Sequence, residues 1–164
     1  MARRTDKNPG TPVIENRKAR HHYHIAHTLE VGIKLVGTEV RSVRDGRCSL
    51  AEGYVRAETE PRLSLTLHSV HIDHYGPAGP QSTGRQHPAT RQRTLLAHKR
   101  EIAKLADASR EKGVTIVPLK LYFKDGFAKL LIGVARGKRT YDKRQDIKKR
   151  EQERDIRRAM SKRM

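Results

Sequence analysis

The histidines are the residues whose type and spacing could most directly hold a metal ion. Nine are present, and five of them form two sets of close neighbours, His22 with His24 and His68 with His71 and His74. Neither set has cysteines or well-placed carboxylates beside it. Spacing by three suits a helix, whereas the local pattern around the second set predicts a strand. We therefore expect solvated histidines and no bound metal.

Patterns that would indicate catalysis or cofactor binding are missing from the sequence. It contains no P-loop, no nucleophile elbow and no glycine-rich dinucleotide fingerprint. A ribonuclease could use His98 with Glu101 or a lysine, but a general acid and base must converge in space, and the spacing does not indicate that. The only cysteine, Cys48, excludes an intrachain disulfide and a Cys-based zinc cluster. We therefore predict a protein that is not an enzyme and has no cofactor.

Net charge is the strongest chemical feature of the chain. The sequence has 36 Lys and Arg against 18 Asp and Glu, a formal net charge of +18 and a pI of about 10.6. Such an excess favours an anionic partner. Nucleic acid is preferred over a membrane surface, because no amphipathic Lys-rich helix with aromatic anchors is present. A soluble protein whose basic tail has no defined partner is the alternative.

Three segments are expected within the 164 residues, which suffice for one domain with tails. Residues 1–12 are polar and rich in Pro and Gly, which predicts a disordered N-terminal arm. Residues 13–136 form the folded domain. Residues 137–164 hold 12 Lys and Arg and 5 Asp and Glu, without an apolar stripe. Because charge pairs alone barely stabilise a helix, this basic tail is expected to be disordered alone and helical on a partner.

The chain is also expected to be a cytoplasmic monomer without membrane association. No apolar run approaches the length of a membrane-spanning helix. The N-terminal residues contain no hydrophobic segment typical of a secretory signal.

Alternating apolar and polar side chains at residues 23–35 form the longest regular pattern. Period-two alternation of this length favours a strand with one face on a core and the other in water. A strand so long usually bends, and Gly32 is the expected place.

Two helices are predicted. A short one follows the long strand, with Thr38 as its N-cap and Val40 and Val43 as its buried face. The main helix is expected over residues 99–112 and ends at Gly113.

The clearest local signal is a hairpin. Residues 117–123 and 128–134 both alternate, and Asp125-Gly126 between them is typical of a type I′ turn. Further strands are expected at residues 54–57 and 63–67, and the parity shift after the second predicts a β-bulge. Residues 75–90 are a loop too polar to build a core. The fold class is therefore mainly β with α (α+β), an OB-like, partly open antiparallel barrel.

A series of short blocks between residues 16 and 144 has a specific combination of side chains. The blocks are Asn16-Arg17-Lys18-Ala19-Arg20-His21, Glu30-Val31-Gly32-Ile33, Gly37-Thr38-Glu39-Val40-Arg41-Ser42, Arg93-Thr94-Leu95-Leu96-Ala97-His98-Lys99-Arg100-Glu101-Ile102, Pro118-Leu119-Lys120-Leu121-Tyr122-Phe123, Ala128-Lys129, Ala135-Arg136-Gly137-Lys138-Arg139 and Asp142-Lys143-Arg144. In this order they closely resemble the SsrA-binding protein family, SmpB.

The resemblance implies a bacterial protein that binds transfer-messenger RNA and carries it to ribosomes stalled without a stop codon. There the nascent chain is tagged and the ribosome is released by trans-translation. The partners implied are transfer-messenger RNA, the small-subunit decoding centre and the mRNA channel. An OB-type ribosomal protein or general RNA chaperone, bound by charge alone, is the alternative.

The resemblance also implies which residues touch RNA. The expected RNA-binding residues are Asn16, Arg17, Lys18, Arg20, Glu30, Leu96, Lys129, Arg136, Lys138 and Arg139. The residues expected at the decoding site or in the mRNA channel are Tyr141, Asp142, Lys143, Arg144 and Met160.

Physical chemistry is compatible with these assignments but leaves alternatives open for two of them. Glu30 could accept hydrogen bonds from a base amino group or a 2′-OH, or be an ordinary strand-face carboxylate. Leu96 lies in an apolar run and could equally be a core residue. Lys129, on the outward face of the hairpin, suits a phosphate contact.

Overall fold

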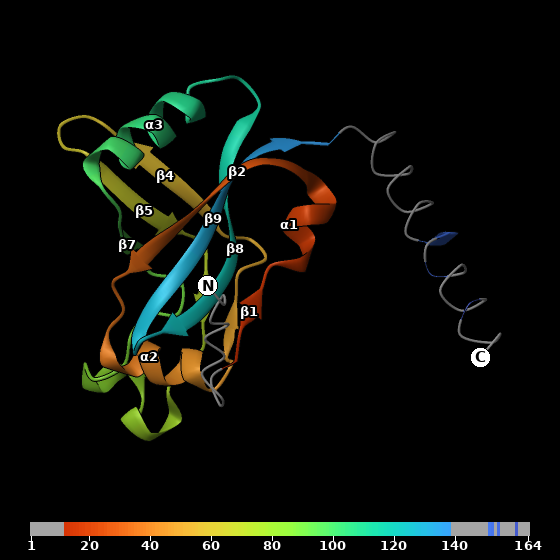
Figure 1. Cartoon of the computed structure of the whole chain (residues 1–164). Helices are drawn as coiled ribbons and strands as arrows, with labels where there is room; N and C mark the ends of the chain where they lie inside the picture. Colours follow the sequence, from red (N-terminus) through yellow and green to blue (C-terminus); the bar gives the residue numbers. More distant parts are fainter. Residues whose placement is uncertain (1–11, 139–150, 153, 155–159, 161–164) are drawn as a thin grey trace.

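An antiparallel sheet curls into a partly open barrel, as the sequence predicts (Figure 1). The computed structural model describes residues 12–138 and, in the tail, Glu151, Gln152, Arg154 and Met160. The strands that form the barrel are β2 (Tyr23–Ile33), β4 (Tyr54–Glu58), β5 (Ser64–His68), β7 (Arg93–Leu96), β8 (Val114–Lys124) and β9 (Phe127–Gly137). Their order is β8-β4-β5-β7-β2-β9, and β9 pairs back onto β8.

The barrel is unevenly closed. β9 pairs with both β2 and β8 along most of its length. In contrast, β7 pairs with β5 and with β2 through two residue pairs each, and β4 meets β8 only at Val55 and Ile116. The long strands β2, β9 and β8 are therefore the most extensively paired part of the sheet.

Within residues 12–138, three helices surround this sheet. α3 (Lys99–Ser109) and α2 (Gly37–Arg44) lie at opposite ends of the barrel, and α1 (Arg17–His22) lies against its side (Figure 1). β1 (Ile14–Glu15) pairs with β8, whereas β3 (Cys48–Ser49) and β6 (His71–Ile72) form a separate two-stranded sheet. Two 3₁₀ turns, η1 (Gly76–Ala78) and η2 (Gln81–Thr83), lie in the loop before β7. Among the residues that the structure describes, no helix is long and apolar enough to cross a membrane.

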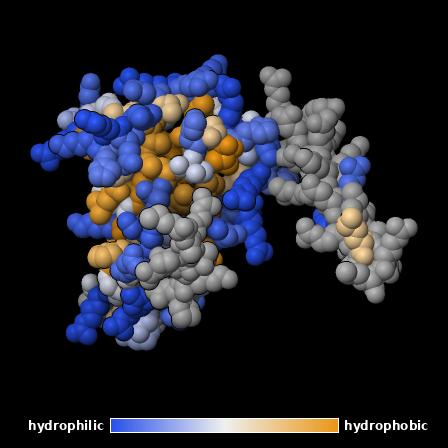
Figure 2. Space-filling view, in the orientation of Figure 1, coloured by the Kyte–Doolittle hydropathy of each residue, from blue (hydrophilic) through white to orange (hydrophobic). Residues whose placement is uncertain are grey.

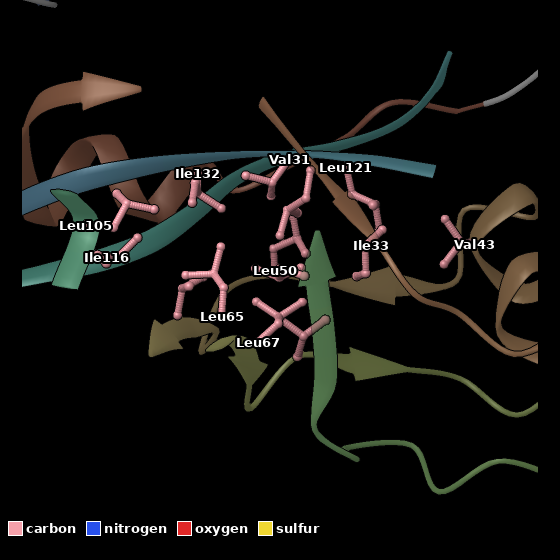
Figure 3. Close-up of a cluster of buried hydrophobic side chains, with 14 of the residues drawn as sticks. Val31, Ile33, Val43, Leu50, Leu65, Leu67, Leu105, Ile116, Leu121 and Ile132 are labelled. Carbon is pink, nitrogen blue, oxygen red and sulfur yellow. The ribbon is translucent and has the colours of Figure 1, made fainter. Parts of the chain in front are cut away.

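The core fills the barrel and is closed at its ends by the helices. Figure 3 shows Leu105 of α3 near one end and Val43 of α2 near the other, with the strand side chains between them. Val43, Leu67, Leu121, Leu130 and Ile132 are completely buried. All of these side chains are aliphatic, as the low aromatic content of the sequence requires.

A second, smaller cluster lies outside the barrel beneath α1. It contains Ala19, Val117, Leu119 and Ala135. The sequence pattern placed Val117 and Leu119 on the same face as Leu121, but a register shift between Pro118 and Lys120 changes the parity of β8. Residues 117 and 119 therefore face outward and are covered by α1, which gives this short helix its docking site.

The predicted hairpin is confirmed. β8 and β9 are joined by Asp125 and Gly126, whose φ angles are 51° and 82°. Positive φ at both central positions is the type I′ geometry. The main helix is also confirmed but ends at Ser109, before the predicted residue 112, with Gly113 at φ 84° in the following turn.

The bend expected at Gly32 stays a prediction; the register shift in β2 lies between Ile25 and His27. Two local expectations are corrected. The parity shift after β5 is not a bulge within one strand, because Ser69 has φ 55° and the chain leaves the barrel to form β6. α2 begins at Gly37, and the amide of Val36 donates to Glu39 Oε2 at 2.9 Å, so Thr38 is not the cap.

The loop at residues 75–90 is polar, but two of its polar side chains, Gln86 and His87, are buried. Gln86 accepts from the amide of Tyr75 and donates to the carbonyls of Tyr75 and Gly79. His87 contacts Thr38 Oγ1 at 2.8 Å and the carbonyl oxygen of Ile72 at 3.2 Å. Because these bonds satisfy the buried groups, the loop packs against α2 and β6 without an apolar core of its own.

Candidate nucleic-acid interface

A row of side chains crosses the outer face of β7, β2, β9 and β8. Strand register pairs Gly32 with both Leu96 and Lys129, and Lys129 with Tyr122. The residues next to them in sequence, among them Val31, Leu95, Leu130 and Leu121, are buried in the barrel. Since successive strand residues point to opposite faces, the row points to solvent. We call Leu96, Gly32, Lys129, Tyr122 and the adjacent Glu30 the outer row.

Glu30 and Tyr122 are joined within the outer row. The hydroxyl of Tyr122 donates a hydrogen bond to Glu30 Oε2. Burial and this hydrogen bond to Glu30 together raise the pKa of Tyr122 to about 12, so the phenol stays protonated at neutral pH. The bond fixes one carboxylate oxygen of Glu30 and leaves Oε1 available to accept from a ligand hydroxyl or amino group.

Leu96 is 59% exposed, which removes the core alternative left open by the sequence. A Cβ built on Gly32 would lie 3.2 Å from Leu96 Cβ. The absence of a side chain at Gly32 therefore allows Leu96 to lie across β2 beside Glu30 and Lys129. An exposed leucine beside an acceptor and a cation is a combination that can contact the sugar and base of a nucleotide.

A second group of predicted residues gathers around α1. Arg17, Lys18 and Arg20 are exposed on this helix, whose inner face buries Ala19. Lys138, at the end of β9, donates from its backbone amide to the carbonyl oxygen of His22 and from Nζ to the carbonyl oxygen of Arg20, both at 2.9 Å. The point where the basic tail leaves the barrel is thus fixed to the last turn of α1.

Asn16 holds α1 in place. Its Oδ1 accepts from the amide of Ala19 at 3.1 Å, and its Nδ2 donates to the carbonyl oxygens of Leu50 and Pro118 at 2.9 and 3.0 Å. The residue is only 7% exposed, and both amide hydrogens are used within the protein. The geometry therefore favours a residue that positions the α1 cations over one that itself contacts RNA.

The remaining predicted residues lie further along the chain. Arg136 Nη2 donates to Glu111 Oε1 at 2.5 Å on the protein surface. Met160 is helical and 70% exposed. The other predicted tail residues lie outside the described part of the chain; these are Arg139, Tyr141, Asp142, Lys143 and Arg144.

The histidines that suggested a metal set are separated by the fold. His68 stacks on Tyr54, His71 is 2.9 Å from Asp73, and His74 meets the ring of His87 edge-on. Across residues 12–138 and the four described tail residues, no three His, Cys, Asp or Glu side chains are grouped as metal ligands would be.

Tyr122 is the member of the outer row that sequence reasoning missed. The signal was present, because the Asp125-Gly126 turn fixes the hairpin register and places Tyr122 opposite Lys129. In the sequence, Tyr122 stands among the apolar residues of its strand, and its type alone does not distinguish it from them.

Hydrophilic side chains border the face shown in Figure 2, while hydrophobic ones gather over the middle of the sheet. A mixed surface of this kind suits a folded RNA, whose phosphates meet cations and whose sugars and bases meet apolar groups.

Comparison with known proteins decides the family. A family model described as "SmpB protein" matches residues 13–162. The chain belongs to the SmpB family. Among curated SmpB relatives, the SsrA-binding protein of Lactiplantibacillus plantarum is 51% identical over 98% of both chains. That of Lactobacillus delbrueckii subsp. bulgaricus is 53% identical over 89% of this chain and 91% of its own.

A solved structure also resembles this SmpB fold. It is described as "tmRNA-SmpB: a journey to the center of the bacterial ribosome". The TM-score is 0.65 at 41% sequence identity, over 79% of this chain and 87% of that chain. Together with the family model over residues 13–162, this likeness confirms the family resemblance drawn from the short sequence blocks.

Proposed function

We propose that this protein binds transfer-messenger RNA and delivers it to stalled ribosomes, where trans-translation tags the nascent chain and frees the ribosome. It acts in the cytoplasm as an RNA-binding protein and catalyses no reaction itself. Membership of the SmpB family is the single observation that carries this function most strongly. The similar solved structure, whose description names tmRNA and the bacterial ribosome, supports the same partners.

Two surfaces of the protein contact the RNA in this proposal. The outer row supplies an acceptor at Glu30, an apolar contact at Leu96 and a cation at Lys129. The α1 region supplies phosphate contacts through Arg17, Lys18 and Arg20, with Lys138 beside them. β2 and β9 connect the two surfaces, so one folded RNA can contact both. Arg136, exposed near the end of β9, adds a cation next to the tail, and Arg139 is proposed from the family resemblance to contact RNA as well.

The tail is the part proposed to act in the ribosome. Tyr141, Asp142, Lys143 and Arg144 would meet the decoding centre, and the following residues would occupy the mRNA channel as a helix. Met160 is exposed on a helical segment, which suits contact with the channel wall. Phosphates of ribosomal RNA would neutralise the tail's excess of positive charge and favour its helical form. The arm at residues 1–12 has no assigned role.

A filter-binding comparison tests the proposal. Transfer-messenger RNA and an ordinary tRNA are titrated with the full-length protein at several salt concentrations. Specific contacts persist when salt weakens phosphate contacts, so the preference for transfer-messenger RNA should remain at high salt. Equal affinity for the two RNAs at every salt concentration would support the alternative, a general RNA chaperone or ribosomal protein bound by charge alone.

A further inference from the structure

A depression between α1 and the start of β4 has no role in the function described so far. It encloses about 280 Å³. One wall is formed by Lys18, Ala19 and His22 of α1, and another by Gly53 and Tyr54. The remaining lining residues are Asn16, Tyr23, Ala51, Glu52, and Thr115 and Val117 of β8.

Tyr54 gives this depression a flat aromatic wall. Its ring stacks on His68, with centroids 5.0 Å apart and planes inclined by 10°. His68 lies on β5, whereas the depression lies on the opposite side of β4, toward β8. The ring face of Tyr54 that is turned away from His68 therefore borders the depression. Tyr54 is 44% exposed, and the stack holds it in place before any ligand arrives.

The opposite wall carries positive charge and adjoins the proposed RNA surface. Lys18 is exposed at the rim, 3.6 Å from Glu52. Tyr23 lines both this depression and a neighbouring one of about 360 Å³ that includes Arg20 and Lys138. An RNA strand held by Arg20 and Lys138 would thus pass the mouth of the depression.

We propose that this depression binds one unstacked base of the RNA held by α1, with the base lying on the free face of Tyr54 and its flanking phosphate beside Lys18. The inference rests on the proposed function and adds a base-binding site separate from the outer row. Aromatic side chains bind single-stranded bases by stacking, and a cation beside the ring meets the backbone. Glu52 can accept a hydrogen bond from a base amino group at the same rim.

RNA is favoured over a peptide as the occupant because of the surrounding charge. The cations Arg17, Lys18 and Arg20 lie on the same helix, and the net charge of the chain is +18. A peptide side chain could contact the ring of Tyr54, but only an acidic one would also be attracted by these cations.

The experiment replaces Tyr54 and measures transfer-messenger RNA binding by the full-length protein. Tyr54→Ala should weaken binding about tenfold, since each stacked base accounts for roughly 1–3 kcal/mol. Tyr54→Phe and Tyr54→Trp keep a ring and should bind within about twofold of the parent protein. Phe127→Ala is the matched control, because Phe127 is 72% exposed at the far hairpin and should have no effect.

Chemical probing of the RNA gives a second readout. If Tyr54 only supported the fold, replacing it would not change the reactivity of one particular base. Dimethyl sulfate and a carbodiimide together report on all four bases. One unpaired base should be protected by the parent protein and by Tyr54→Phe, and become reactive with Tyr54→Ala. A pattern of protection that is identical for all three proteins overturns the proposal.

The outcomes separate this proposal from the function on which it rests. If Tyr54→Ala binds normally while Lys129→Ala is weakened, the base-binding site is wrong and the RNA-binding function stands. If the parent protein fails to prefer transfer-messenger RNA over tRNA, the proposed function itself fails. Circular dichroism confirms that each variant is folded, and if Tyr54→Phe loses affinity as fully as Tyr54→Ala, stacking is not the interaction lost.

Discussion

Some residues of the outer row orient their neighbours, and others are proposed to contact RNA. Tyr122 donates to Glu30, which fixes one carboxylate oxygen, and Gly32 leaves room for Leu96 to lie across the strand. Asn16 does the same for α1 by bonding three backbone groups at once. Residues of both kinds should affect RNA binding, but among the proposed contacts only the cation Lys129 should also alter its salt dependence.

Lys129→Ala tests a residue that is proposed to contact RNA. Removing one phosphate contact should weaken transfer-messenger RNA binding and reduce the slope of log affinity against log salt by about one. Filter binding at several salt concentrations measures both. Lys104→Ala, which removes an exposed lysine from α3, is the control and should leave the slope of specific binding unchanged. An unaltered slope for Lys129→Ala would remove Lys129 from the site.

Tyr122→Phe tests a positioning residue. It removes the hydroxyl that orients Glu30, and the loss of one hydrogen bond, ~1 kcal/mol, should weaken RNA binding about fivefold. Glu30→Ala should weaken it at least as much, and the double variant no further. If the two losses simply add, Tyr122 does not act through Glu30.

The titration of Tyr122 gives a test that needs no RNA. Burial and the hydrogen bond to Glu30 raise the pKa of Tyr122 to about 12. The protonated phenol therefore stabilises the fold below the ordinary tyrosine pKa of 10.0, and this contribution is lost as the pH rises through about 12. Phenolate absorbance should show a late-titrating component that disappears in Tyr122→Phe. Its pKa should fall in Glu30→Gln, and no change there would contradict the assigned bond.

Whole elements are held in place by buried polar groups as well as by apolar packing. Glu39 of α2 accepts from Arg93 Nε of β7 at 2.8 Å and from Arg91 at 2.6 and 2.8 Å, and both Glu39 and Arg93 are fully buried. Arg93 also donates to the carbonyl oxygens of Val70, Ala89 and Arg91. This network ties α2 and the long loop to the strand that carries Leu96.

Glu39→Gln should therefore destabilise the fold by about 3–5 kcal/mol, because it leaves the buried Arg93 without its counter-charge. Chemical denaturation measures the change. Glu58→Gln, which removes a partly exposed carboxylate paired with Arg56, is the control and should cost less than about 1 kcal/mol. Equal effects of the two substitutions would show that the network contributes little.

The same network makes the free energy of unfolding depend on pH in acid. Burial alone would raise the pKa of Glu39, but hydrogen bonds from Arg91 and the Val36 amide, with the charge of Arg93, outweigh burial and lower it below 4.5. A lowered carboxyl pKa stabilises the fold above the unfolded value, and this stabilisation is lost as the pH falls through the folded value. The unfolding free energy of the parent protein should fall in that range more steeply than that of Glu39→Gln.

At the scale of the whole molecule, the barrel and the tail are proposed to have separate tasks. A protein that ends at Lys138 keeps the outer row and the α1 cations but loses residues 139–164. It should bind transfer-messenger RNA with near-normal affinity and fail to support tagging on stalled ribosomes. Filter binding and a tagging assay in a reconstituted translation system measure the two properties.

A general RNA chaperone would behave differently, because its affinity follows charge. The truncation removes most of the tail's 12 Lys and Arg, so affinity for every RNA would fall together. The matched control keeps the full length and replaces only Tyr141 by Ala, which should leave RNA affinity unchanged and reduce tagging.

Local patterns in the sequence determined the elements whose structure depends on near neighbours. Alternation predicted β2, β8 and β9, and Asp125-Gly126 predicted the type I′ turn, since backbone conformation there is set by the residues themselves. The α+β barrel class followed from those strands. The sequence blocks also predicted the family, which the comparisons confirm.

Tertiary structure decided what depends on residues far apart in the chain. Only the fold shows that Glu30 and Leu96 share one surface with the Lys129–Tyr122 pair of the hairpin, because the register of β2 and β7 is fixed by contacts across the whole barrel. The β8 register shift that turns Leu119 toward α1, and the commitment of Asn16 to internal bonds, likewise arise from packing between distant segments. Sequence alone cannot specify such pairings, since each depends on which of many compatible partners the folded chain brings near.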